Sequence, residues 1–164
     1  MGAYKLAELK SRFDIQGALT GEPTRSAIVT KHKGVCRYTI EALGKAAHGS
    51  TPQLGENAIY KIARLVEKLE RLAELLSHED NREPIERGSL NVGRISGGIG
   101  FNIVPDKCSI ELDRRLGVYE KMEEAREAIE VIAKTEIGAS VSTVLERPSL
   151  NTKNQDCFPQ ALAK

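Results

Sequence analysis

The sequence has 164 residues, of which 40% are apolar and 29% charged, a composition typical of a globular domain with one hydrophobic core. Its 24 basic and 23 acidic residues are mixed along the chain and leave a net charge of +1, so no basic face for nucleic acid is expected. No apolar run approaches the length of a membrane span, and the first residues lack the pattern of a secretory signal. We therefore predict a cytoplasmic protein with neither a membrane nor a nucleic-acid partner.

The three cysteines, Cys36, Cys108 and Cys157, are widely spaced and include no CxxC pair. This spacing predicts neither a disulfide framework nor a structural zinc site. Cys36 and Cys108 each fall on the apolar side of a predicted strand, so we expect both to be small core residues.

The first part of the chain combines helical spacing over residues 2–11 with a short apolar run over residues 14–20. The run ends at Gly21-Glu22-Pro23-Thr24. Pro23 restricts the preceding residue to extended backbone geometry, so Glu22 would be presented from a strand end. A turn with one exposed acid is the plain alternative.

A single histidine, His48, lies in the connection between a predicted strand and a predicted helix. Residues 35–43 alternate apolar and polar side chains, which indicates a strand with one packed face. Residues 56–76 repeat apolar side chains at spacings of three and four, which indicates an amphipathic helix. A loop held between two rigid elements often presents a catalytic or binding side chain, although a lone loop histidine is more commonly a solvated surface residue.

The second half of the chain repeats this organisation. Strands are predicted over residues 89–95, 107–116 and 140–146, and a helix over residues 119–137 with Gly138 as its C-terminal cap. A glycine-rich stretch, residues 96–106, joins the first two of these strands. Alternation along residues 107–116 places Arg115 on the open face of the sheet, whereas a bulge would place Arg114 there instead.

The predicted order of elements from residue 35 to residue 147 is strand, helix, strand, strand, helix, strand. We therefore predict an α+β fold of the ferredoxin-like βαββαβ type, with a four-stranded antiparallel sheet and both helices on one face. Residues 26–148 would form this domain. Residues 1–25 and 149–164 would be flanks that belong to another unit.

Three stretches of the chain stand out in a fixed order. They are Gly21-Glu22-Pro23-Thr24, the run from Ala47-His48-Gly49-Ser50-Thr51-Pro52 to Gly55-Glu56-Asn57-Ala58-Ile59, and the stretch from Gly97-Gly98 through Asn102-Ile103-Val104-Pro105-Asp106 to Asp113-Arg114-Arg115. Together they resemble the M20 family of zinc-dependent aminoacylases and peptidases, the group of acetylornithine deacetylase, succinyl-diaminopimelate desuccinylase and carboxypeptidase G. In that family a ferredoxin-like lid, or dimerisation domain, is inserted into a larger catalytic domain. The resemblance implies that residues 26–148 are such a lid and that the two flanks are parts of the catalytic domain.

The resemblance also implies roles for five residues of the lid. His48 matches the histidine that reaches across a homodimer and donates a hydrogen bond to the oxyanion of the tetrahedral intermediate. Asn102 and Arg115 match residues that bind the polar and carboxylate ends of the substrate across the dimer. Gly97 and Gly98 would let the backbone approach that substrate closely.

Glu22 is the one residue that matches a metal ligand of the family. A two-zinc centre needs several His, Asp and Glu ligands, and one carboxylate does not hold zinc. We therefore expect no cofactor in this chain alone and no hydrolysis by it, and we expect two zinc ions in the parent enzyme. The parent's substrate would be a small N-acyl amino acid or peptide, with the acyl group and the amino acid left open.

Two other functions are compatible with parts of the pattern. A stand-alone ferredoxin-like module could bind a small regulatory ligand, whereas an RNA-binding module would need aromatic side chains on its open face, and aromatic residues make up only 4% of the chain. A self-sufficient enzyme that uses Cys157 or a serine with His48 has no recognisable triad. The resemblance favours the lid of an M20 hydrolase.

Overall fold

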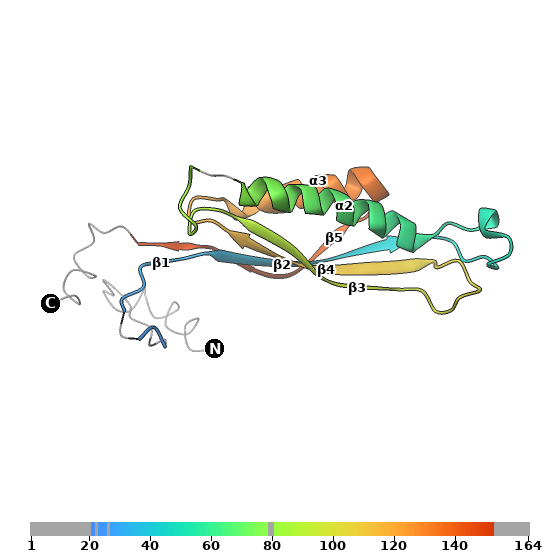
Figure 1. Ribbon diagram of the computed structural model, residues 1–164, viewed down its shortest axis with the longest axis horizontal. Helices are drawn as coiled ribbons and strands as arrows, with labels where there is room; N and C mark the ends of the chain where they lie inside the picture. Colours follow the sequence, from blue (N-terminus) through green and yellow to red (C-terminus); the bar gives the residue numbers. More distant parts are fainter. Residues whose placement is uncertain (1–20, 22, 26, 79–80, 153–164) are drawn as a thin grey trace, which may run out of the picture. The chain divides into compact units, whose positions relative to one another are not determined.

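The computed structural model describes residues 21, 23–25, 27–78 and 81–152 (Figure 1). The chain divides into two compact units, one of residues Lys31–Asn151 and one that combines Met1–Thr30 with Thr152–Lys164. The predicted helix over residues 2–11, the apolar run over residues 14–20 and Glu22 lie outside the described residues.

Four strands of the unit Lys31–Asn151 form one antiparallel sheet in the order β3-β4-β2-β5. Their bounds are β2 Gly34–Leu43, β3 Ser89–Gly97, β4 Lys107–Leu116 and β5 Val141–Arg147. The central strands β2 and β4 pair without a break, from Gly34 opposite Leu116 to Leu43 opposite Lys107. The outer strands each contain one register shift, near Gly93 in β3 and near Val144 in β5. Two short strands, β1 Lys31–His32 and β6 Leu150–Asn151, form a separate pair.

Two helices, α2 Ala58–Ser77 and α3 Met122–Ile137, cover one face of this sheet and leave the other face open (Figure 1). A single 3-10 turn, η1 Pro52–Leu54, precedes α2. The side chain of Asn57 accepts hydrogen bonds from two backbone N–H groups of the first turn of α2, a normal N-cap. Gly138 ends α3 with a left-handed φ of 64°, as predicted for its C-terminal cap. The prediction of an α+β fold with a four-stranded antiparallel sheet is confirmed.

The largest difference from the predicted elements is the start of α3, which begins at Met122 instead of Tyr119. The carboxylate of Glu120 accepts a hydrogen bond from the Gly117 N–H at 2.6 Å, and the Glu120 N–H bonds back to the Gly117 carbonyl at 3.1 Å. These two bonds hold residues 117–120 in a turn, so the helix can start only after it.

The hydrophobic core lies between the sheet and the two helices. Its fully buried members include Tyr38, Ile62, Leu69, Ile110 and Ile129, which come from β2, α2, β4 and α3. Cys36 and Cys108 belong to the same core, as predicted, and burial raises the pKa of both thiols. Among the helices that the structure describes, none is long and apolar enough to cross a membrane.

A matched pair of leucines on α2 tests this packing. The side chain of Leu69 is 0% exposed, whereas Leu75, six residues later on the same helix, is 71% exposed. We expect Leu69→Ala to lower the free energy of unfolding by about 2–5 kcal/mol, because it leaves a cavity, and Leu75→Ala to change it by less than about 0.5 kcal/mol. Urea denaturation of both variants measures the difference, and equal effects would contradict the assigned face of α2.

Candidate functional site

Two loops meet at one end of the sheet, and they carry His48 and Asn102. Residues 44–57 connect β2 to α2, and residues 98–106 connect β3 to β4 (Figure 1). The N–H of Gly49 donates to the carbonyl of Asn102 at 2.7 Å, and the N–H of Val104 donates to the carbonyl of Ala47 at 2.8 Å. The loop pairing therefore places His48 opposite Ile103 and brings two predicted site residues together.

Gly49 permits this close pairing. A Cβ atom added at Gly49 would lie 3.1 Å from the backbone of Asn102, which is tighter than ordinary packing allows. Gly49 is thus part of how the chain joins the two loops, a feature that sequence reasoning did not identify.

The imidazole of His48 is exposed, and its Nδ1 atom is held locally. Nδ1 lies 2.7 Å from the Oγ atom of Ser50 and accepts a hydrogen bond from the Ser50 N–H at 3.2 Å. The side chain of Asn102 is exposed as well. Both polar groups are therefore available to a ligand or a partner at this end of the sheet.

The two predicted glycines, Gly97 and Gly98, have structural reasons of their own. A Cβ atom at Gly97 would lie 2.7 Å from the Sγ atom of Cys108, so a larger residue would not fit against β4. Gly98 has a φ of 80°, the left-handed conformation that glycine adopts most easily. They shape the loop that carries Asn102.

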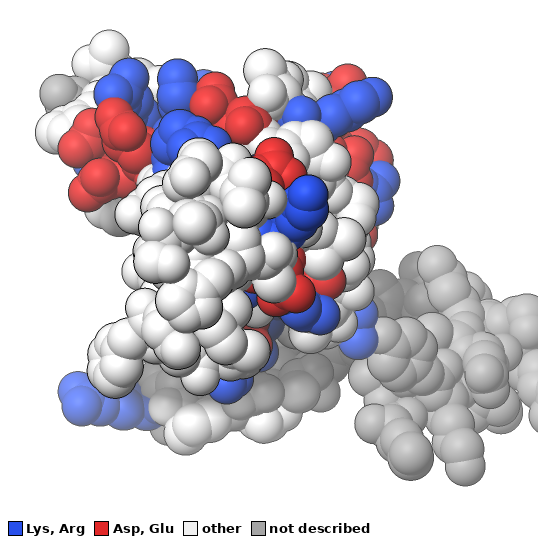
Figure 2. Space-filling model, turned by 90° about the vertical axis from the view of Figure 1, so that its right-hand side faces the viewer, with Lys and Arg blue, Asp and Glu red and all other residues white. Residues whose placement is uncertain are grey.

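Apolar side chains surround this end of the molecule. Ile99 is 84% exposed, and Leu54 and Phe101 are exposed too. Figure 2 looks at this end and shows a surface with few charged groups over the nearest part of the molecule. We call this end of the sheet, with residues 44–57 and 98–106, the loop tip.

Arg115 lies at the opposite end of the sheet from the loop tip. Strand β4 begins at Lys107 beside the loop tip, and eight residue steps along it to Arg115 correspond to about 26 Å at the usual rise of a strand. The structure therefore brings His48 and Asn102 together but does not bring Arg115 to them.

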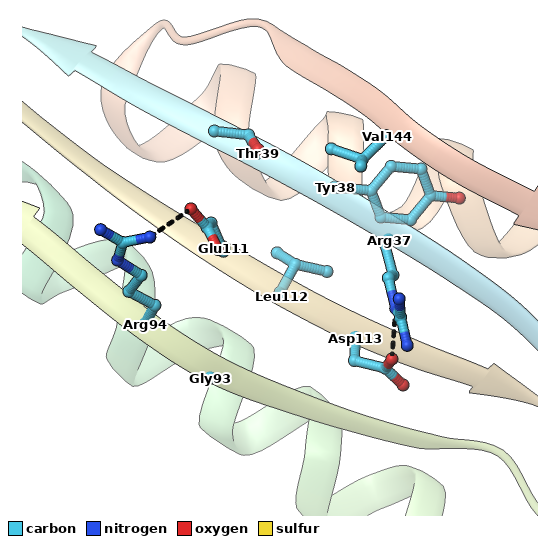
Figure 3. A pocket seen from close by; sticks show the side chains of 9 residues that line it. All are labelled: Arg37, Tyr38, Thr39, Gly93, Arg94, Glu111, Leu112, Asp113 and Val144. Atoms are coloured by element: carbon cyan, nitrogen blue, oxygen red, sulfur yellow. Dashed lines mark hydrogen bonds and ion pairs between the residues drawn. The ribbon is translucent and has the colours of Figure 1, made fainter.

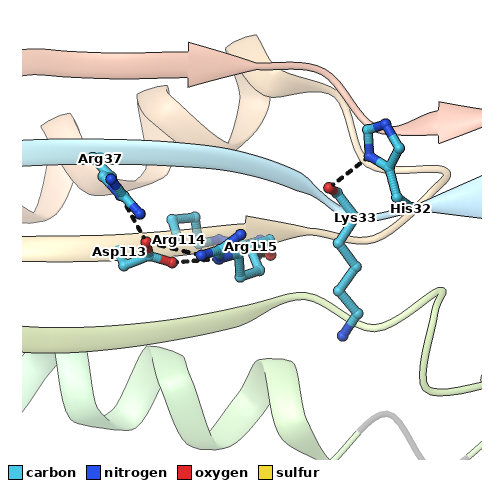
Figure 4. Close-up of polar contacts among 6 residues, drawn as sticks. All are labelled: His32, Lys33, Arg37, Asp113, Arg114 and Arg115. Atoms are coloured by element: carbon cyan, nitrogen blue, oxygen red, sulfur yellow. Dashed lines mark hydrogen bonds and ion pairs between the residues drawn. The ribbon is translucent and has the colours of Figure 1, made fainter. Parts of the chain in front are cut away.

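Arg115 occupies the open face of the sheet, as the alternation predicted, and an acidic neighbour binds its guanidinium (Figure 4). Nε of Arg115 donates to Asp113 at 2.6 Å and Nη2 donates to the same carboxylate at 3.3 Å. Arg37 on β2 donates to Asp113 at 3.0 Å from the other side. Two guanidinium groups thus share one carboxylate, and the cluster carries a net positive charge.

Arg114 has the opposite environment. Its side chain is 4% exposed and forms an ion pair with Glu120 at 2.5 Å, while Glu120 also accepts the Gly117 N–H. No register shift interrupts β4 where it pairs with β2, so Arg114 faces the helices and Arg115 faces away from them. Sequence reasoning left these two arginines as alternatives, and it did not identify Glu120 as the partner of Arg114.

The open face continues beyond this cluster as a shallow hollow of about 560 Å³ (Figure 3). Arg94 pairs with Glu111 at 3.3 Å on one side of the hollow, and Arg37 pairs with Asp113 on the other. Gly93, at the register shift of β3, also lines the hollow and contributes no side chain to it. Alternation would have placed Arg37, Glu111 and Asp113 on this face, but their pairing depends on the strand register.

The described residues contain no group of three or more His, Cys, Asp or Glu side chains that could hold a metal ion. Glu22, the one predicted metal ligand, lies outside the described residues. The donor set of the described chain therefore does not fit a two-zinc centre.

Most of the unit Lys31–Asn151 matches a known family of domains. Residues 30–140 match the model of the M20 peptidase dimerisation domain. The chain belongs to this family. The M20 dimerisation domain thus accounts for nearly all of the unit Lys31–Asn151.

Relatives of this M20 domain include named enzymes of greater length. It is 33% identical over 118 residues to a probable carboxypeptidase of Talaromyces marneffei, covering 70% of this chain and 26% of that protein. It is 35% identical over 116 residues to an acetylornithine deacetylase of Myxococcus xanthus, covering 70% of this chain and 30% of that protein. The chain spans less than a third of the length of these relatives.

Solved structures show the same fold. The aminopeptidase PepT of Bacillus cereus superimposes with a TM-score of 0.62 at 24% identity, covering 80% of this chain and 34% of that one. A tripeptidase of Staphylococcus aureus gives a TM-score of 0.60 at 21% identity, covering 82% of this chain and 35% of that one.

The two neighbouring arginines of this M20 domain can be separated by stability measurements. We expect Arg114→Leu to lower the free energy of unfolding by about 3 kcal/mol, because it leaves the carboxylate of Glu120 without its positively charged partner. Arg115→Leu removes an exposed ion pair and should change stability by less than about 1 kcal/mol. Thermal and urea denaturation of the two variants test this; a larger loss for Arg115→Leu would reverse their assignment.

Proposed function

We propose that this domain is the lid of a metal-dependent amide hydrolase that acts on N-acyl amino acids or small peptides. The observation that carries the proposal is the loop pairing that presents His48 and Asn102 side by side at one end of the sheet. The printed names of the relatives, a probable carboxypeptidase and an acetylornithine deacetylase, agree with this class of reaction. Peptide and N-acyl bonds are both amides, so one lid chemistry can serve either substrate.

His48 would act by hydrogen bonding to the substrate oxygen. When a nucleophile adds to an amide carbon, negative charge develops on the carbonyl oxygen, and a donor aimed at that oxygen stabilises the transition state. A neutral imidazole can supply one such N–H, and the amide of Asn102 can bind a polar group nearby. Both groups come from the loop tip.

Arg115 would bind a substrate carboxylate, since its planar guanidinium can form two parallel hydrogen bonds to one. In the described structure Asp113 occupies that guanidinium, so a substrate carboxylate would take over part of this contact. Because about 26 Å of β4 separates Arg115 from the loop tip, one lid does not present His48, Asn102 and Arg115 to one small substrate. We therefore propose that His48 and Asn102 come from one protomer and Arg115 from the other, whereas the resemblance implied that all three act together across the dimer.

A homodimer built on the edge of the sheet would solve this separation. Strand β3 lies at the edge, seven of its nine residues are exposed, and Arg94 is its one charged residue. Such an edge can pair with a second copy of itself, and a twofold axis makes that pairing antiparallel. Ser89, opposite Arg115, lies at one end of β3, and Gly97 lies at the loop tip. Antiparallel pairing thus brings the loop tip of one protomer beside the Arg115 end of its partner.

Zinc belongs to the proposal only for a longer protein that carries this lid. The described residues do not fit a two-zinc centre, and no step above passes through a metal. Activation of the attacking water is likewise assigned to residues outside the described chain.

The dimer edge can be tested with one substitution on each side of the sheet. Ile95 on β3 is 56% exposed at the proposed interface, and Ser142 on β5 is exposed at the opposite edge. We expect Ile95→Lys to convert a dimer into a monomer, because a lysine on an edge strand opposes pairing of that edge with another strand, and Ser142→Lys to leave the dimer intact. Light scattering after size exclusion at micromolar concentration measures both; a dimer that survives Ile95→Lys and dissociates with Ser142→Lys would move the interface to β5.

Shared sites can be tested by mixing two inactive variants of the hydrolase that carries this lid. His48→Ala and Arg115→Ala should each lower kcat/KM at least about a hundredfold. If one protomer supplies His48 and the other Arg115, half of the dimers in an equal, fully exchanged mixture are mixed and hold one intact site, so about a quarter of the wild-type activity returns. Each variant incubated alone is the control.

No recovery on mixing would mean that both residues serve a site from the same protomer. Full activity of His48→Ala would remove the hydrolase role of the loop tip and favour the regulatory-module alternative.

A further inference from the structure

The contacts of His48 determine which ring nitrogen carries the proton. A backbone N–H group can only donate a hydrogen bond, and the Ser50 N–H points to Nδ1 of His48 at 3.2 Å. Nδ1 must therefore be the unprotonated, accepting nitrogen. The Ser50 hydroxyl, 2.7 Å from the same atom, can then only donate to it.

We propose that Ser50 is a positioning residue that holds His48 as the neutral tautomer with its proton on Nε2. Together with the proposed function, on which this step rests, the tautomer makes Nε2–H the group that donates to the substrate oxygen. A neutral imidazole has one N–H, so the tautomer decides which side of the ring can donate. With Nδ1 engaged by Ser50, the donor is the nitrogen farther from the backbone.

The backbone around His48 supports this arrangement from both sides. The Thr51 N–H donates to the His48 carbonyl at 2.9 Å, which closes a turn over residues 48–51. The Gly49 N–H donates to the Asn102 carbonyl at 2.7 Å, which ties the same turn to the other loop. Within the described part of the chain Nε2 of His48 makes no hydrogen bond, so it remains open to a ligand.

His32 provides a contrast within the same chain. Its Nδ1 atom lies 3.0 Å from the Lys33 carbonyl (Figure 4). A carbonyl oxygen can only accept, so this contact requires the proton on Nδ1. The structure thus assigns a proton to Nδ1 of His32 and none to Nδ1 of His48.

Nitrogen NMR of the chain labelled with ¹⁵N-histidine tests the assignment directly. At pH 9, above the range in which histidines usually titrate, long-range ¹H–¹⁵N spectra distinguish protonated from unprotonated ring nitrogens. We expect unprotonated Nδ1 and protonated Nε2 in His48, and the reverse in His32. Ser50→Ala removes the hydroxyl donor at 2.7 Å and keeps only the backbone N–H at 3.2 Å, so the two His48 nitrogen signals should move part of the way toward each other; Ser50→Thr should restore them, and His32 should not change.

Thr51→Ala is the matched control, because it removes a neighbouring hydroxyl that donates to the His48 carbonyl at 3.5 Å and not to the ring. Its His48 signals should equal those of the wild type. A protonated Nδ1 in wild-type His48, or identical His48 signals in the wild type and Ser50→Ala, would overturn the role of Ser50.

Kinetics of the hydrolase that carries this lid separate this inference from the proposed function. Ser50→Ala should lower kcat about tenfold with little change in KM, since it disturbs the donor but not substrate binding, and Ser50→Thr should restore kcat. If His48→Ala is fully active, the proposed function fails while the NMR result still decides the tautomer. If His48→Ala is inactive and the NMR signals ignore Ser50, the inference about Ser50 alone fails.

Discussion

The uninterrupted antiparallel pairing of β2 with β4 is the constraint on which the rest of the domain depends. Ten residue pairs set the two strands in one register. One face of this pair supplies buried side chains such as Tyr38 and Ile110 to the core beneath α2 and α3. At its end the Gly44 N–H bonds to the Asp106 carbonyl, so the two loops that carry His48 and Asn102 leave the sheet already side by side.

The same pairing produces the separation of the two polar sites. A long strand is a rigid spacer, and β4 places the loop tip at one end and Arg115 at the other. Because β4 is rigid, the residues at each end keep a fixed geometry. For the same reason one lid cannot contact a single small ligand with both the loop tip and Arg115. The proposed edge-to-edge homodimer would make this spacing useful, because antiparallel copies would set unlike ends next to each other.

Two adjacent arginines differ in burial and therefore in what they contribute: Arg114 stabilises the fold, whereas Arg115 is accessible to a ligand. Arg114 is enclosed with Glu120, where a lost partner would leave a buried charge, so its contribution is to the fold. Arg115 is exposed and shares Asp113 with Arg37. Another carboxylate can replace Asp113 at the Arg115 guanidinium at little cost to the stability of the fold. At the loop tip one turn has two roles: residues 48–51 join the two loops through Gly49, and they contact the His48 ring through Ser50.

The sequence by itself determined the α+β element order, the Gly138 cap and the core positions of Cys36 and Cys108, whereas the unbroken register of β4 against β2 was needed to place Arg115 and not Arg114 on the open face. The first three follow from local rules, because side-chain periodicity and capping depend on residues a few positions apart. Only the tertiary structure decided that His48 meets Asn102 while Arg115 lies far from both. Those relations depend on strand register and on hydrogen bonds between residues more than fifty positions apart, which no local pattern in the sequence encodes.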